Sequence, residues 1–324
     1  MKAIRVSKPG GPEALQYEDA PDPKPEPGEV LLRVEAAGVN FADTLARKGL
    51  YPTSTPPPFI PGFEVAGTVI GVGEGVEGIT AGHRVMGFAP QGGYAELAVM
   101  PAASAIPIPE PMTFEEAAAF PIVFLTAYHA LKSFGRLRQG ESVLIHAAGG
   151  GVGTAAVQLA KVWGARVFAT AGSDEKLSRV KGLGADEVLN YRTADFAEAV
   201  KHWTRGKGVD VILESVGGEV FEKSLRSLAR DGRLVAIGFS SGVQPQLQLG
   251  LLVMNGLSVL GLHIGVMTLK QPELIRTSAR ELIELLAKGR IKPVISHVFP
   301  LREAAEAHRI LEGRGSYGKL VLTP

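Results

Sequence analysis

A glycine-rich run near the middle of the chain contains the residues whose types and spacing point most directly to chemistry. Residues 148–153 read AGGGVG, between an apolar, β-branched run at 142–147 and an apolar helical pattern at 154–164. A second strand is predicted at 166–170. Glycines permit a tight turn and a close approach of the backbone to a pyrophosphate, whose charge the N–H groups of the helix N-terminus stabilise. This order of elements predicts a dinucleotide site rather than a structural turn without a ligand. The residues expected to hold the phosphates are Gly150, Gly151, Val152 and Gly153.

The residues that follow the second strand indicate which dinucleotide would bind. An NAD site places a carboxylate about 20 residues after the glycines, where it binds the ribose 2′-hydroxyl, but this chain has Ala171 and Gly172 there. Without the carboxylate there is room for a 2′-phosphate, to which Ser173 would donate a hydrogen bond and Lys176 would supply positive charge. The acids at 174–175 are expected in the first turn of the next helix, where they suit the helix dipole. The pattern favours NADPH over NADH.

Composition restricts the classes of protein to which the chain can belong. Its 324 residues suffice for two hydrophobic cores, and 45% hydrophobic with 21% charged residues is ordinary for a globular protein. The formal net charge of +1 and the lack of a basic run argue against nucleic acids and anionic membranes as partners. No apolar stretch reaches the ~18 residues that span a bilayer, and residues 1–10 lack the apolar core of a signal peptide. The absence of cysteine excludes disulfides and thiolate zinc sites. We expect a cytoplasmic enzyme.

Two kinds of pattern divide the chain. Short strands and glycine or proline turns dominate residues 1 to about 120, which predicts a barrel-like β-domain. A helical segment follows, with Thr113 as its N-cap and Glu116 completing a capping box. From residue 142 onward strands alternate with helices, which predicts a doubly wound parallel sheet covered on both faces and ending in a strand at 256–264. A long amphipathic helix, a second helix and two strands at 294–300 and 319–324 are expected to return to the first domain.

Five blocks of sequence together resemble the medium-chain dehydrogenase/reductase superfamily, and within it the zinc-free quinone oxidoreductases related to zeta-crystallin. The resemblance covers essentially the whole chain and implies an α/β fold with two domains. The first is a β-rich GroES-like catalytic domain at 1–122, completed by 266–324, and the second is a Rossmann NADP-binding domain at 123–265. The blocks are residues 36–52, 61–73, 81–88, 146–161 and 169–176.

The resemblance also indicates that the catalytic metal is missing. Zinc-dependent members of the superfamily place a cysteine at the position of Asn40 and a histidine at the position of Phe63. Asparagine is a poor zinc ligand and phenylalanine is none. Without a Lewis acid, alcohol oxidation would lose its main stabiliser. We therefore expect hydride transfer from NADPH to an electron-poor acceptor, either a quinone or an α,β-unsaturated carbonyl.

Catalytic residues are implied by the same resemblance. In the relatives, the motif matching Asn40 and Asp43 lies beside the nicotinamide, and Tyr51 matches a tyrosine that is a candidate proton donor. The alternative for Tyr51 is a loop tyrosine packed under prolines, and the alternative for Asp43 is a helix N-terminal carboxylate. Asn40 is expected to orient the carboxamide of the cofactor or a substrate carbonyl. Leu45 stands where some quinone oxidoreductases have a second tyrosine.

Further cofactor-binding residues follow from the resemblance and from the rule that open α/β sheets bind ligands at their carboxyl edge. Thr126 matches a threonine near the nicotinamide, Tyr191 an aromatic residue near the adenosine phosphate, and Arg314 a basic residue near the 2′-phosphate. His129 and His146 are expected in the core or in helices, and the other histidines considered (His83, His202, His297 and His308) at the surface or in structural roles. The strand-end residues expected to line the cofactor site are Gly238, Phe239, Ser240, Ser241, Leu262 and His263.

The leading functional hypothesis is an NADPH-dependent reductase of quinones or enones. An enoyl-thioester reductase acting on acyl-CoA or acyl-carrier substrates is the alternative within enzymes, and a non-catalytic NADPH-binding protein is the alternative outside them. The apolar strand at 256–264 would be a free sheet edge in a monomer. Pairing with its twofold mate predicts a homodimer, with a tetramer as the alternative.

Overall fold

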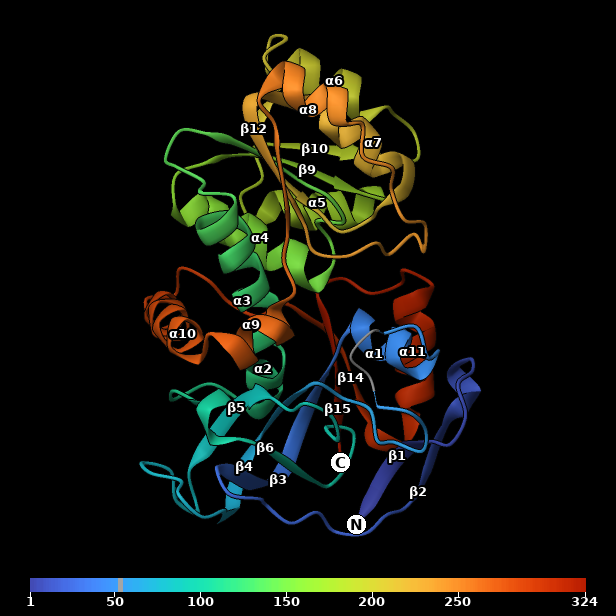
Figure 1. The fold of residues 1–324 in the computed structure, drawn as a ribbon, viewed down its shortest axis with the longest axis vertical. Helices are drawn as coiled ribbons and strands as arrows, with labels where there is room; N and C mark the ends of the chain where they lie inside the picture. Colours follow the sequence, from blue (N-terminus) through green and yellow to red (C-terminus); the bar gives the residue numbers. More distant parts are fainter. Residues whose placement is uncertain (52–54) are drawn as a thin grey trace. The chain divides into compact units, whose positions relative to one another are not determined.

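The computed structural model describes residues 1–51 and 55–324, and the chain divides into two compact units (Figure 1). Unit 1 comprises Met1–Ile122, Gly265–Ala287 and Pro293–Pro324. Unit 2 comprises Val123–Ile264 and Lys288–Lys292. Each unit has its own sheet and its own core. The assignment of a catalytic role to one and of NADP binding to the other stays a prediction.

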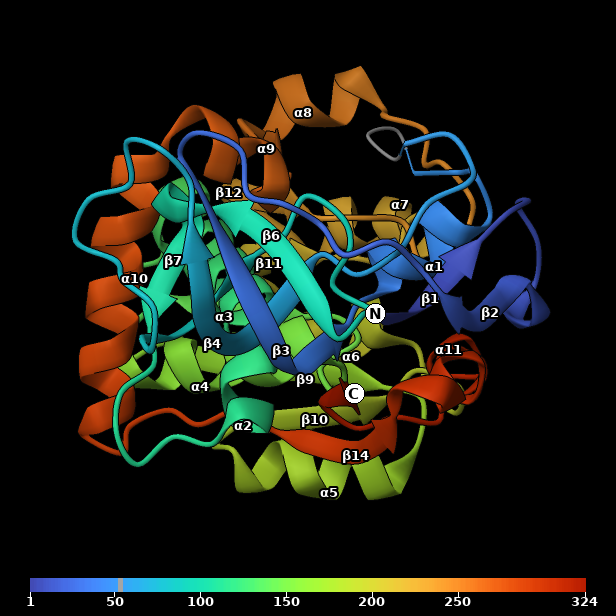
Figure 2. The ribbon, with the colours of Figure 1, turned by 90° about the horizontal axis from the view of Figure 1, so that it is seen from below.

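Unit 1 is built on a seven-stranded sheet in which the long strand β3 (Glu29–Val39) is central. Strand β4 pairs along one edge of β3, whereas the other edge is shared by β6, opposite residues 29–33, and β15, opposite residues 37–39. Figure 2 shows β3 lying between β4 and β6. A separate hairpin joins β1 (Lys2–Val6) to β2 (Leu15–Asp19). The other strands of the sheet are β4 (Glu64–Val72), β5 (Arg84–Phe88), β6 (Leu97–Pro101), β7 (Ala105–Pro107), β14 (Ile295–Pro300) and β15 (Lys319–Thr323).

The core of unit 1 follows from alternation along these strands. Val30, Leu32 and Val34 are buried, while Arg33 between them is exposed. The predicted capping box is confirmed, since Thr113 Oγ1 accepts from Glu116 N at 3.2 Å and Thr113 N donates to the Glu116 carboxylate at 3.1 Å. The helices are α1 (Phe41–Arg47), α2 (Phe114–Ala118), α9 (Ile264–Lys270), α10 (Pro272–Ala287) and α11 (Ala304–Glu312).

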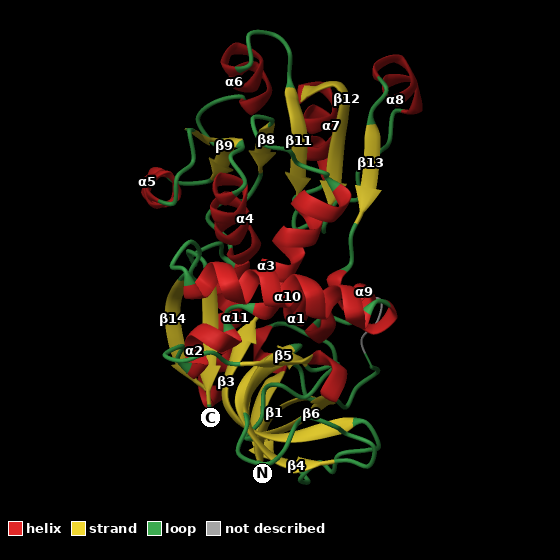
Figure 3. Cartoon of the chain, turned by 90° about the vertical axis from the view of Figure 1, so that its left-hand side faces the viewer, coloured by secondary structure: helices red, strands yellow, loops and turns green. Residues whose placement is uncertain are grey.

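Unit 2 is a six-stranded parallel sheet in the order β10-β9-β8-β11-β12-β13. The chain starts at the central strand β8, moves outward to β10, and then returns to the other side of β8 with β11. This reversal is the strand order of a Rossmann fold and confirms the predicted class. Figure 3 shows the arrows of β11, β12 and β13 pointing the same way. The strands are β8 (Ser142–Ile145), β9 (Arg166–Ala171), β10 (Glu187–Asn190), β11 (Val209–Glu214), β12 (Leu228–Ala236) and β13 (Ser258–Gly261).

Helices pack against this sheet and close its core. Phe196 and Val200 of α6 and Phe221 and Leu225 of α7 join Phe168 in one buried cluster. His129 and His146 are buried, as predicted, and burial lowers their pKa values to about 4 and about 3. The helices are α3 (Pro121–Tyr128), continued by a wider turn (His129–Phe134), α4 (Gly151–Val162), α5 (Asp174–Gly182), α6 (Phe196–Trp203), α7 (Gly218–Ser227) and α8 (Leu249–Asn255).

Two local features differ from the sequence prediction. The final strand of unit 2, β13, spans four residues instead of the whole run at 256–264, because Gly256 is the C-cap of α8 and the chain enters α9 at Ile264. Helix α8 was not predicted, and its apolar residues Leu249, Val253 and Met254 are exposed rather than arranged on a buried stripe. In the part of the chain that the structure describes, every helix falls short of the length or apolarity that crossing a membrane requires.

Candidate functional site

The glycine-rich turn of unit 2 lies where the strand order reverses, at the carboxyl end of β8. Helix α4 begins at Gly151 with Gly150 at its N-cap, and no described side chain caps it. The N–H groups of its first turn are therefore free to bind an anion. Ala147, at the start of the turn, has a φ of 47°, and its carbonyl accepts the Gly150 N–H at 2.9 Å.

Two glycines of this turn have different roles. A Cβ atom on Gly153 would lie 2.5 Å from both the Ala147 oxygen and the Ala148 Cα, so glycine is required for α4 to pack this close to the turn. A Cβ on Gly150 would meet only the Ala147 oxygen, at 3.3 Å. The space beside Gly150 is therefore open, as a cradle for a pyrophosphate requires.

Side chains with positive charge or hydroxyl groups gather at the end of β9. A Cβ on Gly172 would lie 2.6 Å from the Tyr191 hydroxyl and 3.3 Å from Arg192 Nε, and a Cβ on Gly149 would lie 3.1 Å from Lys176 Cδ. Ser173 is the N-cap of α5, and its Oγ accepts from Lys176 N at 3.4 Å. Its O–H therefore remains able to donate.

Arg192 is the member of this group that the sequence analysis missed. It directly follows Tyr191 after β10, and β10 is the neighbour of β9 in the sheet. Its place directly after Tyr191, at the end of a predicted strand, is the feature of the sequence from which Arg192 could have been included among the site residues. The two acids nearby lie in the first turn of α5, as predicted, and are engaged elsewhere. Asp174 accepts from the Asn190 amide at 2.8 Å, and Glu175 pairs with Arg179 at 2.7 Å.

The loops after β11 and β12 are bonded to each other at the same sheet edge. Ser240 N donates to Ser215 O and Ser241 N to Val216 O, both at 2.9 Å. The buried Glu214 carboxylate accepts from Val216 N and Gly217 N, and burial raises the pKa of its carboxyl group. The other predicted residues of this unit are strand-end or helix residues: Leu262 is bonded through its N–H to Ala236 O, His263 is exposed, and Thr126 is buried in α3.

In unit 1, Asn40 and Asp43 are brought together at the start of α1. Asn40 is the N-cap residue, and its backbone N–H donates to Asp43 Oδ2 at 2.7 Å. Asp43 is thus a helix N-terminal carboxylate, the alternative considered for it. It is also fully buried, accepts from the Tyr94 hydroxyl at 3.0 Å, and its Oδ1 has no partner among the described residues. Burial raises the pKa of this carboxyl group to about 7, although the bond from Asn40 N–H opposes the rise.

The side chain of Asn40 belongs to a buried ion-pair cluster that the sequence analysis missed. Asn40 Nδ2 donates to Gly38 O and to Glu64 Oε2, each at 3.1 Å. Lys319 Nζ donates to Asn40 Oδ1 at 2.7 Å, to Glu64 Oε2 at 2.8 Å and to Val39 O at 3.0 Å. A Cβ on Gly38 would collide with the Glu64 carboxylate and the Ala118 oxygen, so glycine makes room for the cluster.

A second group of buried side chains continues from Asp43. The Tyr94 hydroxyl lies 3.2 Å from His308 Nε2, and Arg47 Nη1 donates to His308 Nδ1 at 3.2 Å. Because arginine only donates, His308 Nδ1 accepts and Nε2 carries the hydrogen that is donated to the Tyr94 oxygen. Burial lowers the pKa of His308 to about 3, so this ring is neutral. This chain of bonds from Asp43 through Tyr94 and His308 to Arg47 holds α1 in place.

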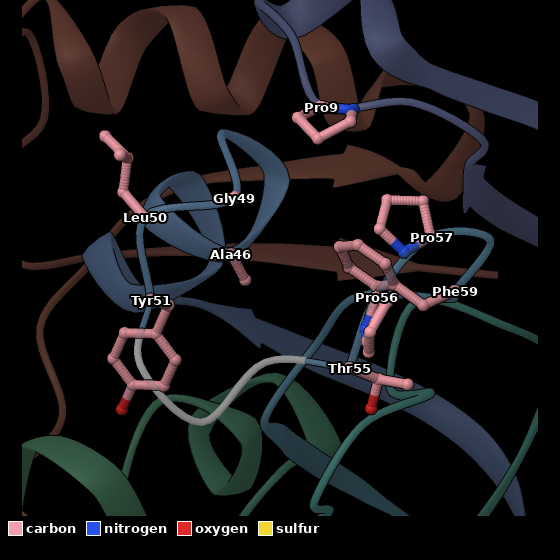
Figure 4. Close-up of a pocket in the computed structure, with 9 residues that line it drawn as sticks. All are labelled: Pro9, Ala46, Gly49, Leu50, Tyr51, Thr55, Pro56, Pro57 and Phe59. Carbon is pink, nitrogen blue, oxygen red and sulfur yellow. The ribbon is translucent and has the colours of Figure 1, made fainter.

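Tyr51 lies apart from this buried cluster, at the edge of a pocket. Its ring is half-buried and packs 5.3 Å from the ring of Phe63. The pocket has a volume of about 450 Å³. In Figure 4 the Tyr51 hydroxyl points away from Pro9 and Leu50. Residues 52–54 of the predicted proline-rich loop lie outside the described residues. The pocket is lined by Pro9, Ala46, Gly49, Leu50, Tyr51, Thr55, Pro56, Pro57 and Phe59.

Two further expectations concern metals and Arg314. Within residues 1–51 and 55–324 the structure contains no group of three histidine or acidic side chains arranged to hold a metal ion. Arg314 lies in the turn after α11 of unit 1, with a φ of 57°. Its role toward a 2′-phosphate stays a prediction.

Comparison with known proteins gives consistent matches to the chain. The family described as "Alcohol dehydrogenase GroES-like domain" matches residues 26–110, and "Zinc-binding dehydrogenase" matches residues 151–287. A quinone oxidoreductase of Rattus norvegicus is 37% identical over 327 residues, which are 99% of this chain and 97% of that protein. The crystal structure of Escherichia coli quinone oxidoreductase complexed with NADPH superposes with a TM-score of 0.94 at 37% identity, covering 100% of both chains. A phenolphthiocerol/phthiocerol polyketide synthase of Mycobacterium tuberculosis is 36% identical over 99% of this chain and 15% of its own length.

Proposed function

The chain belongs to the quinone oxidoreductase family of the medium-chain dehydrogenase/reductase superfamily, and on that premise we propose that it is an NADPH-dependent, metal-independent reductase of quinones or α,β-unsaturated carbonyls. The observation that carries the proposal is the group of Ser173, Lys176, Tyr191 and Arg192 at the end of β9. These side chains can bind a 2′-phosphate, and the acids beside them are engaged with other residues. The Escherichia coli relative was solved with NADPH.

The residues present fit such a cofactor. The open space beside Gly150 and the first turn of α4 would bind the pyrophosphate. When bound, NADPH supplies a hydride from its nicotinamide ring. Thr126, Arg314 and the strand-end residues named above remain proposed contacts of the cofactor.

Metal independence is supported by the chemistry of the side chains at the family's metal position. Both amide hydrogens of Asn40 are used by Gly38 and Glu64, and its oxygen accepts from Lys319. Phe63 offers no ligand atom. The Lys319 ammonium, 2.7 Å from Asn40 Oδ1, would also repel a cation placed there.

Tyr51 is the proposed proton donor to the reduced substrate. A phenol O–H can donate a proton, and Tyr51 lies at the edge of a pocket of about 450 Å³ whose lining is about equally polar and apolar. Asp43, in contrast, is fully buried. We therefore assign Asp43 a positioning role, through its bond to the Asn40 N–H, in place of contact with substrate.

Two alternatives remain. An enoyl-thioester reductase is favoured by the match of the chain to a segment of a polyketide synthase. A non-catalytic NADPH-binding protein would keep the cofactor site without turnover.

For the assembly we propose a homodimer formed through β13, an edge strand of the unit 2 sheet. We also propose a cytoplasmic location.

The test is oxidation of NADPH, with NADH alongside, in the presence of 1,2-naphthoquinone, an alkyl vinyl ketone or crotonyl-CoA. We expect the quinone or the enone to be reduced with NADPH preferred. Tyr51→Phe should lower kcat by ~10²-fold if the tyrosine is a general acid, while Tyr17→Phe, at an exposed position in β2, should leave kcat unchanged.

The outcomes separate the alternatives. Dominant turnover of crotonyl-CoA would favour the enoyl-thioester reductase. NADPH binding without turnover of any of the three would favour the non-catalytic protein. Full activity of Tyr51→Phe toward the quinone would remove the tyrosine from the mechanism and leave protonation to water.

A further inference from the structure

Glu214, the last residue of β11, is a buried acid that lies directly below two loops at the carboxyl edge of the unit 2 sheet. We infer that Glu214 is a positioning residue: it orients two peptide groups of the loop at 215–217, and through them it holds the loop at 237–243 in the shape to which the cofactor binds. The part of this inference that concerns the cofactor rests on the proposed function. The coupling of the two loops does not.

The Glu214 carboxylate is bonded to backbone N–H groups of the residues that follow it. Its Oε1 accepts from Val216 N at 2.7 Å and from Gly217 N at 3.1 Å, and its Oε2 accepts from Gly217 N at 3.1 Å. Among the described residues no lysine or arginine pairs with it, and burial raises the pKa of the carboxyl group while these bonds oppose the rise. A buried carboxylate without a cation depends on such bonds, so the loop at 215–217 is held in the conformation that supplies them.

The same two peptide groups are bonded on their opposite sides to the loop at 237–243. The Val216 N–H and the Ser215 carbonyl belong to one planar trans peptide group, so they point in opposite directions. The N–H faces the carboxylate, and the Ser215 oxygen accepts from Ser240 N at 2.9 Å. In the next peptide group the Gly217 N–H faces the carboxylate, and the Val216 oxygen accepts from Ser241 N at 2.9 Å. The carboxylate therefore sets the direction of both carbonyl groups.

Close packing ties the two loops together further. Gly217 has a φ of 77°, and a Cβ atom on it would lie 2.7 Å from both the Phe239 Cβ and the Val243 oxygen. Gly218 N donates to that same Val243 oxygen at 3.0 Å. A peptide group that turned in the first loop would thus displace the second.

The coupled loops lie where an open parallel sheet binds its ligands. Strand β11 is the neighbour of β8, and β12 is the neighbour of β11, so both loops follow strand ends on the same edge as the glycine-rich turn. Gly238, Phe239 and Ser241 are exposed at this edge. Glu214 is 0% exposed and can act on a ligand only through the loops.

The coupling is tested by hydrogen exchange, measured by NMR without cofactor, at the amides of Val216, Gly217, Ser240 and Ser241. In the wild type we expect all four to be protected, because each donates a hydrogen bond. Glu214→Leu removes the acceptor of the first two only. We expect exchange to become about tenfold faster at all four. The change at the two serines, which Glu214 does not contact, is the signature of the coupling.

The effect on the cofactor is tested by the Kd of NADP⁺, measured by calorimetry. A loosened loop must be ordered on binding, so we expect Glu214→Leu to bind NADP⁺ about five- to tenfold more weakly. Glu214→Gln keeps the size of the side chain and one acceptor oxygen, but its NH₂ group opposes a backbone N–H. It should weaken binding by about two- to fivefold, and it serves if Glu214→Leu does not fold.

Asp210→Leu is the matched control, because Asp210 lies near the amino end of the same strand. Its Oδ2 accepts from Ser142 N and from Ser142 Oγ, each at 2.7 Å. Removing this carboxylate also breaks bonds to β11, but at the opposite edge of the sheet. Exchange at the four amides and the Kd of NADP⁺ should both keep their wild-type values.

Each outcome decides between the possibilities. Unprotected Ser240 and Ser241 amides in the wild type, faster exchange confined to Val216 and Gly217 in the Glu214 variants, or an unchanged Kd in those variants would overturn this inference and leave the proposed function standing. The same losses in Asp210→Leu would overturn it too, since they would follow from general destabilisation. Absence of NADP⁺ binding to the wild type would overturn the proposed function, and the exchange rates would still decide whether the loops are coupled.

Discussion

The candidate sites of the two units are made of different groups: backbone groups in unit 2 and buried side chains in unit 1. In unit 2 the nucleotide turn uses backbone: glycines leave room, the first turn of α4 offers N–H groups, and the charged side chains that assist, such as Arg192, are exposed. In unit 1 the cluster around Asn40 uses buried side chains from distant parts of the chain, including Glu64 and Lys319. A site made of backbone groups depends little on its side chains, but a Cβ atom added at a glycine such as Gly153 would displace the backbone. A buried ionic site depends on each partner being present.

The largest effect is expected from Lys319→Met. Removing this ammonium leaves the buried Glu64 carboxylate without its ion-pair partner, which should lower the free energy of unfolding by about 3–5 kcal/mol. Both tryptophans, Trp163 and Trp203, lie in unit 2, so circular dichroism should show an early unfolding step that tryptophan fluorescence does not. Lys2→Met, at a surface ion pair, should change stability by less than about 1 kcal/mol. An equal free energy of unfolding in the two variants would show that the buried ion pair stabilises the fold no more than the surface ion pair does.

The next effect is a pH dependence that comes from Asp43. The folded chain holds its proton up to about pH 7, while the unfolded chain releases it near pH 3.8. The stability that this proton contributes is therefore complete below the unfolded pKa and is lost as the pH rises to about 7, by up to roughly 4 kcal/mol. Asp43→Asn removes the titration and keeps an acceptor for the Asn40 N–H. Urea unfolding of both proteins from pH 4 to 8 should show the wild type losing stability relative to the variant, and parallel profiles would contradict the raised pKa.

A smaller effect is expected in the backbone site. Gly153→Ala places a Cβ 2.5 Å from the Ala147 oxygen and the Ala148 Cα, and the forced shift should lower the free energy of unfolding by about 1–3 kcal/mol. The unfolding transition followed by tryptophan fluorescence should shift to a lower denaturant concentration, and the affinity for NADPH should fall as well. Gly182→Ala is the matched control, since a Cβ at this position in α5 meets no atom within 4 Å and alanine favours a helix. If both variants lose stability equally, the close packing of α4 on the turn is not what requires glycine.

The smallest effect is expected from the exposed charges around the 2′-phosphate position. Arg192→Leu should weaken NADPH binding by about fivefold, because one screened, charged hydrogen bond is lost. Its affinity for NADH, which lacks the 2′-phosphate, should stay unchanged. Arg226→Leu, an exposed arginine in α7, should alter neither Kd. A fall in affinity for both cofactors would place Arg192 away from the 2′-phosphate.

The contrast between the units also explains what could be predicted from the sequence. The strand, glycine turn and helix at residues 142–164 are local, so their pattern predicted β8, the turn and α4 directly. Thr113 and Glu116 are likewise neighbours whose capping box needs no tertiary contact. The alternation of strands and helices predicted the parallel sheet of unit 2 but not the order of its strands, which the structure shows.

The cluster around Asn40 could not be predicted in this way. It depends on the pairing of β15 with β3, which places Lys319 beside Asn40 although 279 positions separate them. The local contacts of Asn40, with Gly38 and Asp43, give no indication that Lys319 lies beside it. Arg192 was missed for a related reason, since only the adjacency of β10 and β9 brings it to Gly172. Helix α8 was missed because its apolar residues do not follow the period of a buried face.

The pairing of β15 with β3 has a consequence for the order of events during synthesis on the ribosome. All of Val123–Ile264 is translated before residue 319, so nearly the whole of unit 2 can form its sheet early. Strand β3 leaves the ribosome among the first segments, yet the edge of residues 37–39 has no partner until Lys319–Thr323 has been made. Until then the Glu64 carboxylate has no Lys319 ammonium to neutralise it, and Asn40 Oδ1 lacks the hydrogen bond from that ammonium. The first part of the chain to be made is therefore among the last to reach its native state, and any factor that shields an unpaired strand edge would act on β3 during this interval.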